Sequence, residues 1–258
     1  MNRYIRFAKE TAFAAGQMLL KGVSKKIRID HKGEVNLVTE MDLKSENMIY
    51  SAIRKMFPAH SILAEEGSSE DTGSEYRWIV DPLDGTTNYA HRYPVWCVSM
   101  ALEFNGEIAG GVIYNPNLDE MFYGWRGKGA FVNRKRLHVS RQPRLSEAFL
   151  ATGFPYDIRE TELDNIDNFA RFYKRCQAVR RGGSAALDLA YTAAGIFDGF
   201  WELKLSPWDT AAGKLLVEEA GGKVTDFSGN GFDIFGKEIV SANSRLLRQM
   251  LEVLKGNN

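Results

Sequence analysis

One stretch decides the fold: Trp78-Ile79-Val80-Asp81-Pro82-Leu83-Asp84-Gly85-Thr86-Thr87-Asn88. It opens with a short apolar run that is typical of a buried strand. Pro82 has no N–H to donate, so we expect sheet pairing to end there. Gly85 and the small polar residues after it are typical of a helix start, where free backbone N–H groups hold an anion. Two carboxylates, Asp81 and Asp84, thus flank a turn beside an anion cradle, which indicates a divalent-metal phosphoryl site.

The composition of the chain narrows the class of protein. Its 258 residues suffice for one large or two modest domains with a sizeable core. Lys+Arg and Asp+Glu both number 33, and this balance argues against extended nucleic-acid binding. Cys97 and Cys176 form no CxxC pair, and the histidines lie far apart, so neither a disulfide framework nor a zinc site is indicated. With no signal segment and no run of membrane-spanning length in the sequence, we expect a cytoplasmic protein.

The apolar pattern of the first half predicts paired helices followed by a sheet. Helices are expected at 3–21 and 39–57, the second with Thr39 as N-cap and Asp42 three residues on, and a polar strand and loop at 25–36 between them. A short strand at 61–64 leads into Glu65, and 68–75 reads as a loop. Strands at 95–104, 107–114, 120–125 and 129–132 are separated by turns such as Asn105-Gly106, which predicts an antiparallel sheet.

Strands and helices alternate beyond a polar boundary at 140–144. Strands are expected at 148–152, 178–179, 197–203, 223–226 and 239–242, and helices at 165–175, 184–194, 206–220 and 246–254. The sequence therefore predicts an α/β (α+β) protein. Residues 1–142 carry the helices, the large antiparallel sheet and most metal ligands, and residues 143–258 form a smaller α/β half. The two halves together make one catalytic domain with the active site between them.

Each acidic candidate also has an ordinary structural explanation. Glu65 suits a solvated loop, Asp81 a cap or salt bridge, and Asp84 a turn. Asp42 and Asp209 each lie at the third position of a predicted helix, where a carboxylate caps the backbone.

The spacing of the acidic candidates favours a shared function. Glu65 lies 16 residues before Asp81, and a Trp-Asp pair at a helix start ends at Asp209, 125 residues after Asp84. Such a set is harder to obtain by chance than any one of its motifs.

The sequence resembles the inositol monophosphatase family, within the metal-dependent, lithium-sensitive phosphatases. The resemblance rests on Ala-Glu-Glu-Gly at 64–67, on the stretch 78–89, and on Trp-Asp at 208–209 followed by Glu-Glu-Ala-Gly-Gly at 218–222. It covers nearly the whole chain, from Tyr4 to Leu254. It implies a layered α-β-α-β-α sandwich of the inositol monophosphatase and fructose-1,6-bisphosphatase type, and a homodimer.

The resemblance also implies a role for each site residue. Two or three Mg²⁺ ions, with Mn²⁺ as a substitute, would be held by Glu65, Asp81, the Leu83 carbonyl, Asp84 and Asp209. Catalysis is assigned to Thr86, which positions and deprotonates the attacking water with help from Asp42 or Glu65. Substrate contacts are assigned to Asp84, Gly85, Thr86, Gly183, Ser184, Ala185, Glu202 and Asp209.

The expected reaction is hydrolysis of a phosphate monoester, most simply myo-inositol monophosphate. Oxygen ligands suit Mg²⁺ or Mn²⁺ better than zinc. The motif holds no cysteine or histidine, so direct in-line attack by metal-activated water is expected. The segment 86–94 resembles the inositol branch, and Glu202 suits a polyol hydroxyl. Fructose 1,6-bisphosphate, or a broad range of sugar and nucleotide phosphates, is the alternative, for which Lys204 would be a second anion contact rather than a surface lysine.

Two readings from other classes stay open. One is an RNA- or transcription-complex-associated regulatory protein that keeps this fold. The basic residues at 171–181 support it, and the balanced net charge argues against it. The other is a structural metal-binding domain, which predicts metal affinity without turnover.

Overall fold

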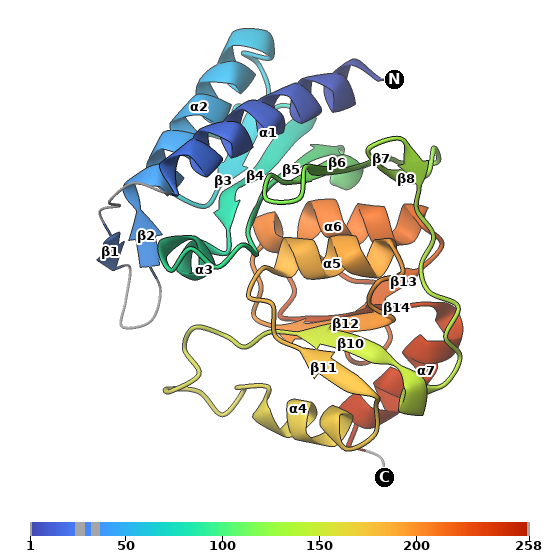
Figure 1. The fold of residues 1–258 in the computed structure, drawn as a ribbon. Helices are drawn as coiled ribbons and strands as arrows, with labels where there is room; N and C mark the ends of the chain where they lie inside the picture. The colour runs from blue at the N-terminus through green and yellow to red at the C-terminus, as the bar shows by residue number, and fades with distance from the viewer. Residues whose placement is uncertain (1, 24–28, 32–36, 257–258) are drawn as a thin grey trace.

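The computed structural model describes residues 2–23, 29–31 and 37–256 and arranges them in layers (Figure 1). Two helices cover one face of the larger sheet, two more lie between the larger and the smaller sheet, and a last pair covers the outer face of the smaller sheet. These helices are α1 (Arg3–Gly22) and α2 (Glu40–Met56), then α5 (Ala185–Ala193) and α6 (Pro207–Glu219), then α4 (Ile166–Tyr173) and α7 (Ser244–Leu254). The predicted layered α/β fold is confirmed.

The larger sheet has seven strands in the order β3-β4-β5-β6-β7-β8-β9. They are β3 (Ser61–Ala64), β4 (Tyr76–Asp84), β5 (Cys97–Phe104), β6 (Glu107–Asn115), β7 (Glu120–Trp125), β8 (Ala130–Val132) and β9 (Lys135–Arg136). All neighbouring strands are antiparallel except β3 and β4. The predicted Asn105-Gly106 hairpin is present, and both residues have the positive φ that its turn requires, at 51° and 79°.

The smaller sheet has five strands in the order β11-β10-β12-β14-β13. They are β10 (Phe149–Thr152), β11 (Ala178–Arg180), β12 (Gly199–Leu203), β13 (Lys223–Thr225) and β14 (Glu238–Ala242). β10 runs parallel to both of its neighbours, which places Thr152 opposite Trp201. Much of the predicted segment 25–36 lies outside the described residues, and β1 (Ile29–His31) within it pairs with β2 (Leu37–Thr39).

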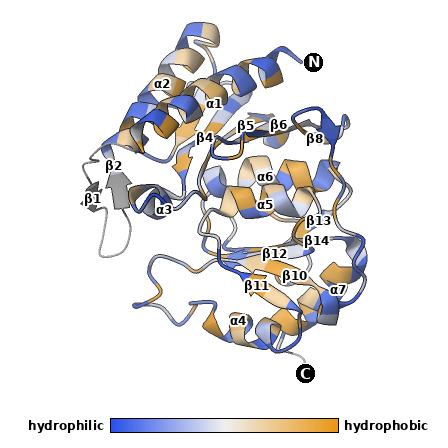
Figure 2. Cartoon of the chain, in the orientation of Figure 1, coloured by the Kyte–Doolittle hydropathy of each residue, from blue (hydrophilic) through white to orange (hydrophobic). Residues whose placement is uncertain are grey.

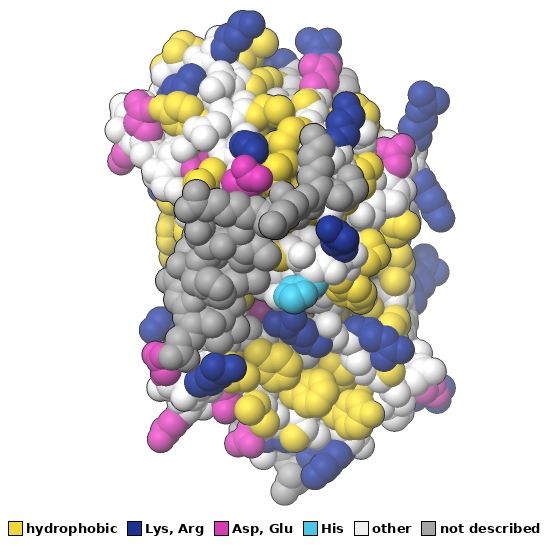
Figure 3. All heavy atoms as spheres, turned by 60° about the vertical axis from the view of Figure 1, so that its left-hand side comes forward, with side chains coloured by type: hydrophobic (Ala, Val, Ile, Leu, Met, Phe, Trp, Pro, Cys, Tyr) yellow, Lys and Arg dark blue, Asp and Glu magenta, His cyan; other side chains and the backbone are white. Residues whose placement is uncertain are grey.

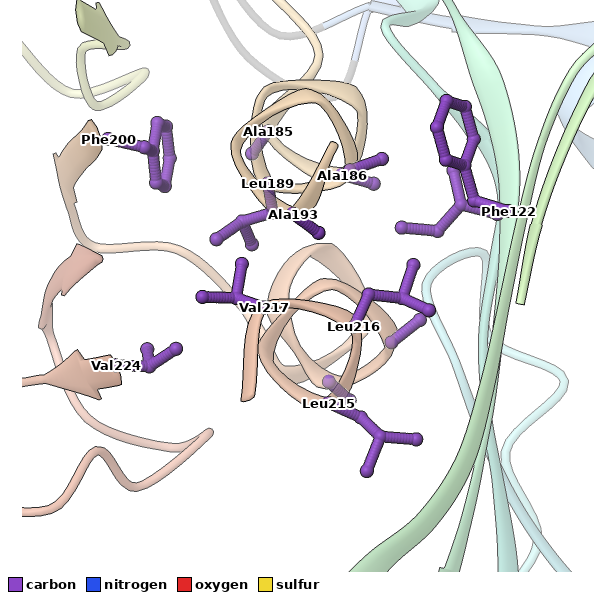
Figure 4. Close-up of a cluster of buried hydrophobic side chains, with 14 of the residues drawn as sticks. Phe122, Ala185, Ala186, Leu189, Ala193, Phe200, Leu215, Leu216, Val217 and Val224 are labelled. Carbon is purple, nitrogen blue, oxygen red and sulfur yellow. The ribbon is translucent and has the colours of Figure 1, made fainter. Parts of the chain in front are cut away.

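The main core fills the space on both sides of the central helices α5 and α6 (Figure 4). Phe122 of β7 packs from the larger sheet, whereas Phe200 of β12 and Val224 of β13 pack from the smaller one. A helix between two sheets must be apolar nearly all round. Most residues of α5 and α6 are accordingly apolar or buried, although Figure 2 also shows some hydrophilic residues on them. The helices α1 and α2 mix hydrophilic and hydrophobic residues, as expected for helices with one solvent-facing side.

The hydrophobic core extends across the predicted boundary between the two halves. α6, from the second half of the sequence, packs on β5 and β6 of the larger sheet, so the core crosses residue 142. The division into halves at that residue stays a prediction.

Within the described residues, no helix has the length and apolar character needed to cross a membrane. On the face shown in Figure 3, Lys and Arg side chains are scattered among hydrophobic and acidic ones.

Candidate active site

The end of β4 carries a bulge between its two aspartates. The pairing with β5 shifts register between Asp81 and Asp84, and Asp84 then lies opposite Cys97. The expectation that Pro82 ends the sheet pairing is therefore wrong, because the bulge carries the chain past the missing donor and pairing resumes. The Pro82 carbonyl accepts a hydrogen bond from the buried Ser45 hydroxyl of α2 at 2.8 Å. This contact fixes the bulge to the helix layer behind it.

A cavity of about 300 Å³ opens at this bulge. Its walls come from the larger sheet, the central helices and the smaller sheet. The predicted site residues that line it are Glu65, Asp81, Leu83, Asp84, Gly85, Thr86, Gly183, Ser184, Ala185, Glu202 and Asp209. Asp42 lies behind this wall, in contact with Thr86. Segments separated by more than a hundred residues in the sequence thus meet in one cavity.

Three carboxylates meet in this cavity, two of them buried and that of Asp209 partly buried. One oxygen from each of Asp81, Asp84 and Asp209 lies within 4.8 Å of the others. Burial and the neighbouring charges of Glu65 and Asp84 raise the pKa of Asp81 well above its usual value, and burial with the charge of Asp84 raises the pKa of Asp209 to about 8. Like charges held this close need a cation to be stable in their ionised form. Because all the donors are hard oxygens, the group fits Mg²⁺ or Mn²⁺.

Hydrogen bonds fix all three carboxylates in place. Asp81 Oδ1 accepts from the Leu83 N–H at 2.9 Å within the turn. Asp84 accepts from the Ser184 hydroxyl at 2.5 Å and from the Ala186 N–H at 2.8 Å, both at the start of α5. Asp209 accepts from the Ser206 N–H at 2.7 Å in a capping box at the start of α6. The capping explanation for Asp209 is therefore correct, and its place in the acidic group shows that the same carboxylate also faces the cavity.

Glu65 reaches the cavity from the turn after β3. Glu46 of α2, only 3% exposed, holds this turn by accepting from the Glu66 N–H at 2.7 Å and the Ser68 N–H at 2.8 Å. Sequence reasoning missed Glu46. The sequence signal for Glu46 was an acid on the apolar face of an amphipathic helix, where a buried carboxylate needs hydrogen-bond donors.

Thr86 and Asp42 form a buried hydrogen-bonded pair. The Thr86 hydroxyl donates to Asp42 Oδ1 at 2.7 Å, and Asp42 Oδ2 accepts from the Thr39 N–H at 2.8 Å in the predicted capping box of α2. Burial raises the pKa of Asp42, although these hydrogen bonds oppose the shift. Asp42 thus caps α2, as its position in the sequence predicted, and it also holds the hydroxyl of a residue in the cavity wall.

Gly85 turns the chain from β4 into the short helix α3 (Thr86–Ala90). Its φ is 95°, and a Cβ there would lie 2.9 Å from the Val95 carbonyl oxygen, so both conformation and space require glycine. The Asn88 amide donates to the carbonyls of Val95 at 2.7 Å and Gly182 at 2.9 Å. This side chain ties the metal turn to the loop that starts α5.

The wall opposite the metal turn contains two further buried acids. Glu202 of β12 is 7% exposed and Asp188 of α5 is 3% exposed. Burial, followed by the charge of Asp188, raises the pKa of Glu202 well above its usual value. Sequence reasoning found Glu202 and missed Asp188. The available signal was a single acid in the otherwise apolar helical stretch 185–190, where burying a carboxylate without a partner costs free energy.

The sequence profile of the inositol monophosphatase family matches residues 1–256. The chain belongs to this family. It is 41% identical to an inositol-1-monophosphatase of Rhizobium meliloti, over 95% of this chain and 94% of that one, and 39% identical to the Nus factor SuhB of Pseudomonas aeruginosa, over 99% and 97%. The solved structure of inositol monophosphatase from Anabaena (Nostoc) sp. PCC 7120 is 43% identical, with a TM-score of 0.90 over 99% of this chain and 96% of that one.

This member of the inositol monophosphatase family carries cationic side chains at its cavity. The Lys204 ammonium donates to Asp157 Oδ2 at 2.7 Å and to the Thr161 hydroxyl at 2.8 Å. Lys204 is therefore neither a plain surface lysine nor an unpaired anion contact. Of the basic residues at 171–181, Arg181 lines the cavity and is exposed at its rim, whereas the Arg180 guanidinium lies over the Phe149 ring at 4.9 Å.

Proposed function

We propose that the protein is a Mg²⁺-dependent phosphatase that hydrolyses myo-inositol monophosphate. The observation that carries this proposal is the convergence of Asp81, Asp84 and Asp209 within 4.8 Å at the wall of a cavity that Thr86 also lines. Membership of the inositol monophosphatase family and the 41% identity to an inositol-1-monophosphatase support it. The structural metal-binding alternative explains the acids but not the cavity beside them.

The three aspartates, with Glu65 and the Leu83 carbonyl, are the residues proposed to hold the cations, and Mn²⁺ should replace Mg²⁺. When bound, a divalent cation in such a site neutralises phosphate charge, lowers the pKa of a water molecule and stabilises the leaving oxygen. The phosphate would lie against the backbone N–H groups of Gly85 and Thr86. Gly183, Ser184 and Ala185 would form the opposite wall, since they line the same cavity.

Thr86 is proposed to orient the attacking water. Its hydroxyl lies 2.7 Å from Asp42 Oδ1 and 3.1 Å from the Leu83 carbonyl oxygen, and the shorter contact directs the hydrogen to Asp42. The Thr86 oxygen is then left to accept a hydrogen bond from water. A proton leaving the water would move to Thr86 Oγ1 while the Thr86 proton moves to Asp42 Oδ1. The raised pKa of the buried Asp42 suits a proton acceptor. Glu65 is the alternative acceptor, since it lines the cavity directly.

Glu202 is proposed to accept a hydrogen bond from a substrate hydroxyl. A phosphate-release panel with Mg²⁺ tests the assignment, using inositol 1-phosphate, fructose 1,6-bisphosphate, 3'-phosphoadenosine 5'-phosphate, NADP and histidinol phosphate. Inositol 1-phosphate should show the highest kcat/KM. A higher value for fructose 1,6-bisphosphate would replace the proposed substrate with the alternative, and phosphate release from none of the five would overturn the phosphatase assignment.

A role in transcription is the second candidate, because a relative 39% identical over 99% of this chain is named a Nus factor. The Asp84→Asn variant separates the two functions. If that variant lost phosphatase activity and still bound transcription complexes, the chain would carry both. RNA binding no stronger than to a neutral polymer would count against this second role.

We also propose that the chain forms a homodimer in the cytoplasm. Large hydrophobic side chains are exposed on and before α4, at Tyr156, Leu163, Ile166 and Tyr173. An apolar surface of this kind commonly marks a protein contact. Both cysteines are free, as expected in a reducing compartment. Light scattering at micromolar concentration should give twice the 29.0 kDa chain mass, and a monomer mass would contradict the proposal.

A further inference from the structure

The cavity wall opposite the metal turn holds two carboxylates that lack hydrogen-bond partners. Asp188 and Glu202 are 3% and 7% exposed, and both line the cavity. Among the described residues, no N–H or O–H group donates to either carboxylate, and neither forms an ion pair. Arg181 acts on both only as a distant charge. Buried acceptors without donors are unfavourable unless a ligand supplies the donors.

Two glycines make room for these carboxylates. A Cβ on Gly153 would lie 2.0 Å from Glu202 Oε1 and 2.5 Å from Oε2. A Cβ on Gly182 would lie 3.0 Å from Asp188 Oδ1. Neither glycine has the positive φ that demands glycine. Space for the acid, rather than backbone conformation, therefore explains both glycines, and the arrangement places two acceptors side by side on one wall.

Asp188 lies in the first turn of α5, where the helix dipole favours a carboxylate, but among the described residues it caps no backbone N–H group. Ser184, not Asp188, is the N-cap of α5. Two cationic side chains line the same cavity, and neither forms an ion pair with Asp188 or Glu202: Lys204 pairs with Asp157, and Arg181 is exposed at the rim. A neutral residue of the same size would pack at position 188 without the desolvation of a carboxylate.

We propose that Asp188 is a specificity-determining residue that, with Glu202, forms a two-acceptor subsite for hydrogen-bond donors on the leaving group. This inference rests on the proposed phosphatase function and names the chemistry that the site selects. Hydroxyl or ammonium groups on the leaving group supply the missing donors. A second phosphate would bring further negative charge against two carboxylates in a poorly solvated wall and is rejected.

The test compares wild-type protein with Asp188→Asn, which keeps the shape and removes the charge. Dissociation constants for inositol 1-phosphate, histidinol phosphate and fructose 1,6-bisphosphate are measured by calorimetry with Ca²⁺ in place of Mg²⁺, so that the ligand is not hydrolysed during the titration, and phosphate release is measured in Mg²⁺ in parallel. Asp188→Asn should weaken inositol 1-phosphate binding about tenfold and leave fructose 1,6-bisphosphate binding unchanged or tighter. A larger loss for histidinol phosphate than for inositol 1-phosphate would identify an ammonium as the preferred donor.

Controls separate this inference from the proposed function. Asp167→Asn removes the same charge from an exposed position on α4 and should change no dissociation constant. Asp188→Ser, smaller and also neutral, replaces Asp188→Asn if the latter does not fold. Equal effects on mono- and bisphosphate, or no effect on either, would overturn the subsite. Selective binding without any phosphate release would overturn the phosphatase assignment and leave the subsite intact, whereas wild-type protein that binds none of the three ligands would overturn both.

Discussion

Replacing Gly153 with alanine should displace the Glu202 carboxylate from the cavity wall. The new Cβ would lie 2.0 Å from Oε1, 2.3 Å from Cδ and 2.5 Å from Oε2, whereas ordinary contacts begin at 3.4 Å. The carboxylate must therefore move by roughly 1 Å or more. The backbone cannot yield instead, because the Gly153 carbonyl accepts from the buried Asn165 amide at 2.7 Å and that amide's oxygen accepts from Trp201 at 3.0 Å.

The kinetic effect follows from the lost hydrogen bond between Glu202 and the substrate. A hydrogen bond to a charged group contributes about 1.5–3 kcal/mol, which corresponds to roughly a 10- to 100-fold rise in KM for inositol 1-phosphate. We expect kcat to stay within about threefold, since the reacting atoms lie at the opposite wall. Steady-state kinetics of Gly153→Ala and of Glu202→Gln should therefore show the same pattern.

A matched glycine control isolates the steric argument. A Cβ on Gly231 meets nothing within 4 Å, so Gly231→Ala should keep the wild-type KM. Thermal unfolding of Gly153→Ala should remain cooperative and near the wild-type temperature, because its φ lies outside the left-handed region. A wild-type KM in Gly153→Ala would refute the placement of Glu202 as a substrate contact, and a large loss of kcat at unchanged KM would move it into the chemical step.

Three further predictions address the acids, the hydroxyl and pH. Metal-free Asp84→Asn should unfold about 2–4 °C above wild-type, since one of three crowded charges is gone, and Mg²⁺ should no longer raise its unfolding temperature; a lower metal-free temperature would contradict this. Thr86→Val should reduce kcat about 10²–10⁴-fold in a phosphate-release assay while Thr86→Ser stays active, and a fully active valine variant would remove Thr86 from water positioning. Burial lowers the pKa of His60 below 6.5, so the folded state binds fewer protons than the unfolded state and stability should fall as pH drops below 6.5. Denaturant titrations of His60→Phe should lack this part of the pH dependence, and an unchanged profile would contradict it.

Most elements of the fold were predictable because apolar periodicity and turn residues are local signals. The helix at 3–21 and the strands around Asn105-Gly106 are examples, and their observed ends differ by only a few residues. The short strand β9, Lys135–Arg136, was missed because it is two exposed charged residues without a pattern. The bulge at Pro82 was missed because a missing N–H does not reveal whether pairing resumes beyond it.

The site was predictable only in part, for a related reason. Glu65, Asp81, Asp84 and Asp209 stand in motifs that point to their chemistry, and the structure brings them to one cavity. The need for a glycine at position 153 follows instead from the parallel register of β10 and β12. This register places Gly153 beside Glu202, which lies 49 residues later in the sequence. The role inferred for Asp188 likewise depends on its lying on the same cavity wall as Glu202, which the sequence alone does not show.

The central claim is that Asp81, Asp84 and Asp209 share a divalent cation at the cavity wall. Titration calorimetry with Mg²⁺ on metal-free wild-type protein, Asp84→Asn and Asp209→Asn tests it most directly. The wild-type protein should bind Mg²⁺, and each variant should lose at least tenfold in affinity while remaining folded. Mg²⁺ affinity that is the same in all three proteins would contradict the claim.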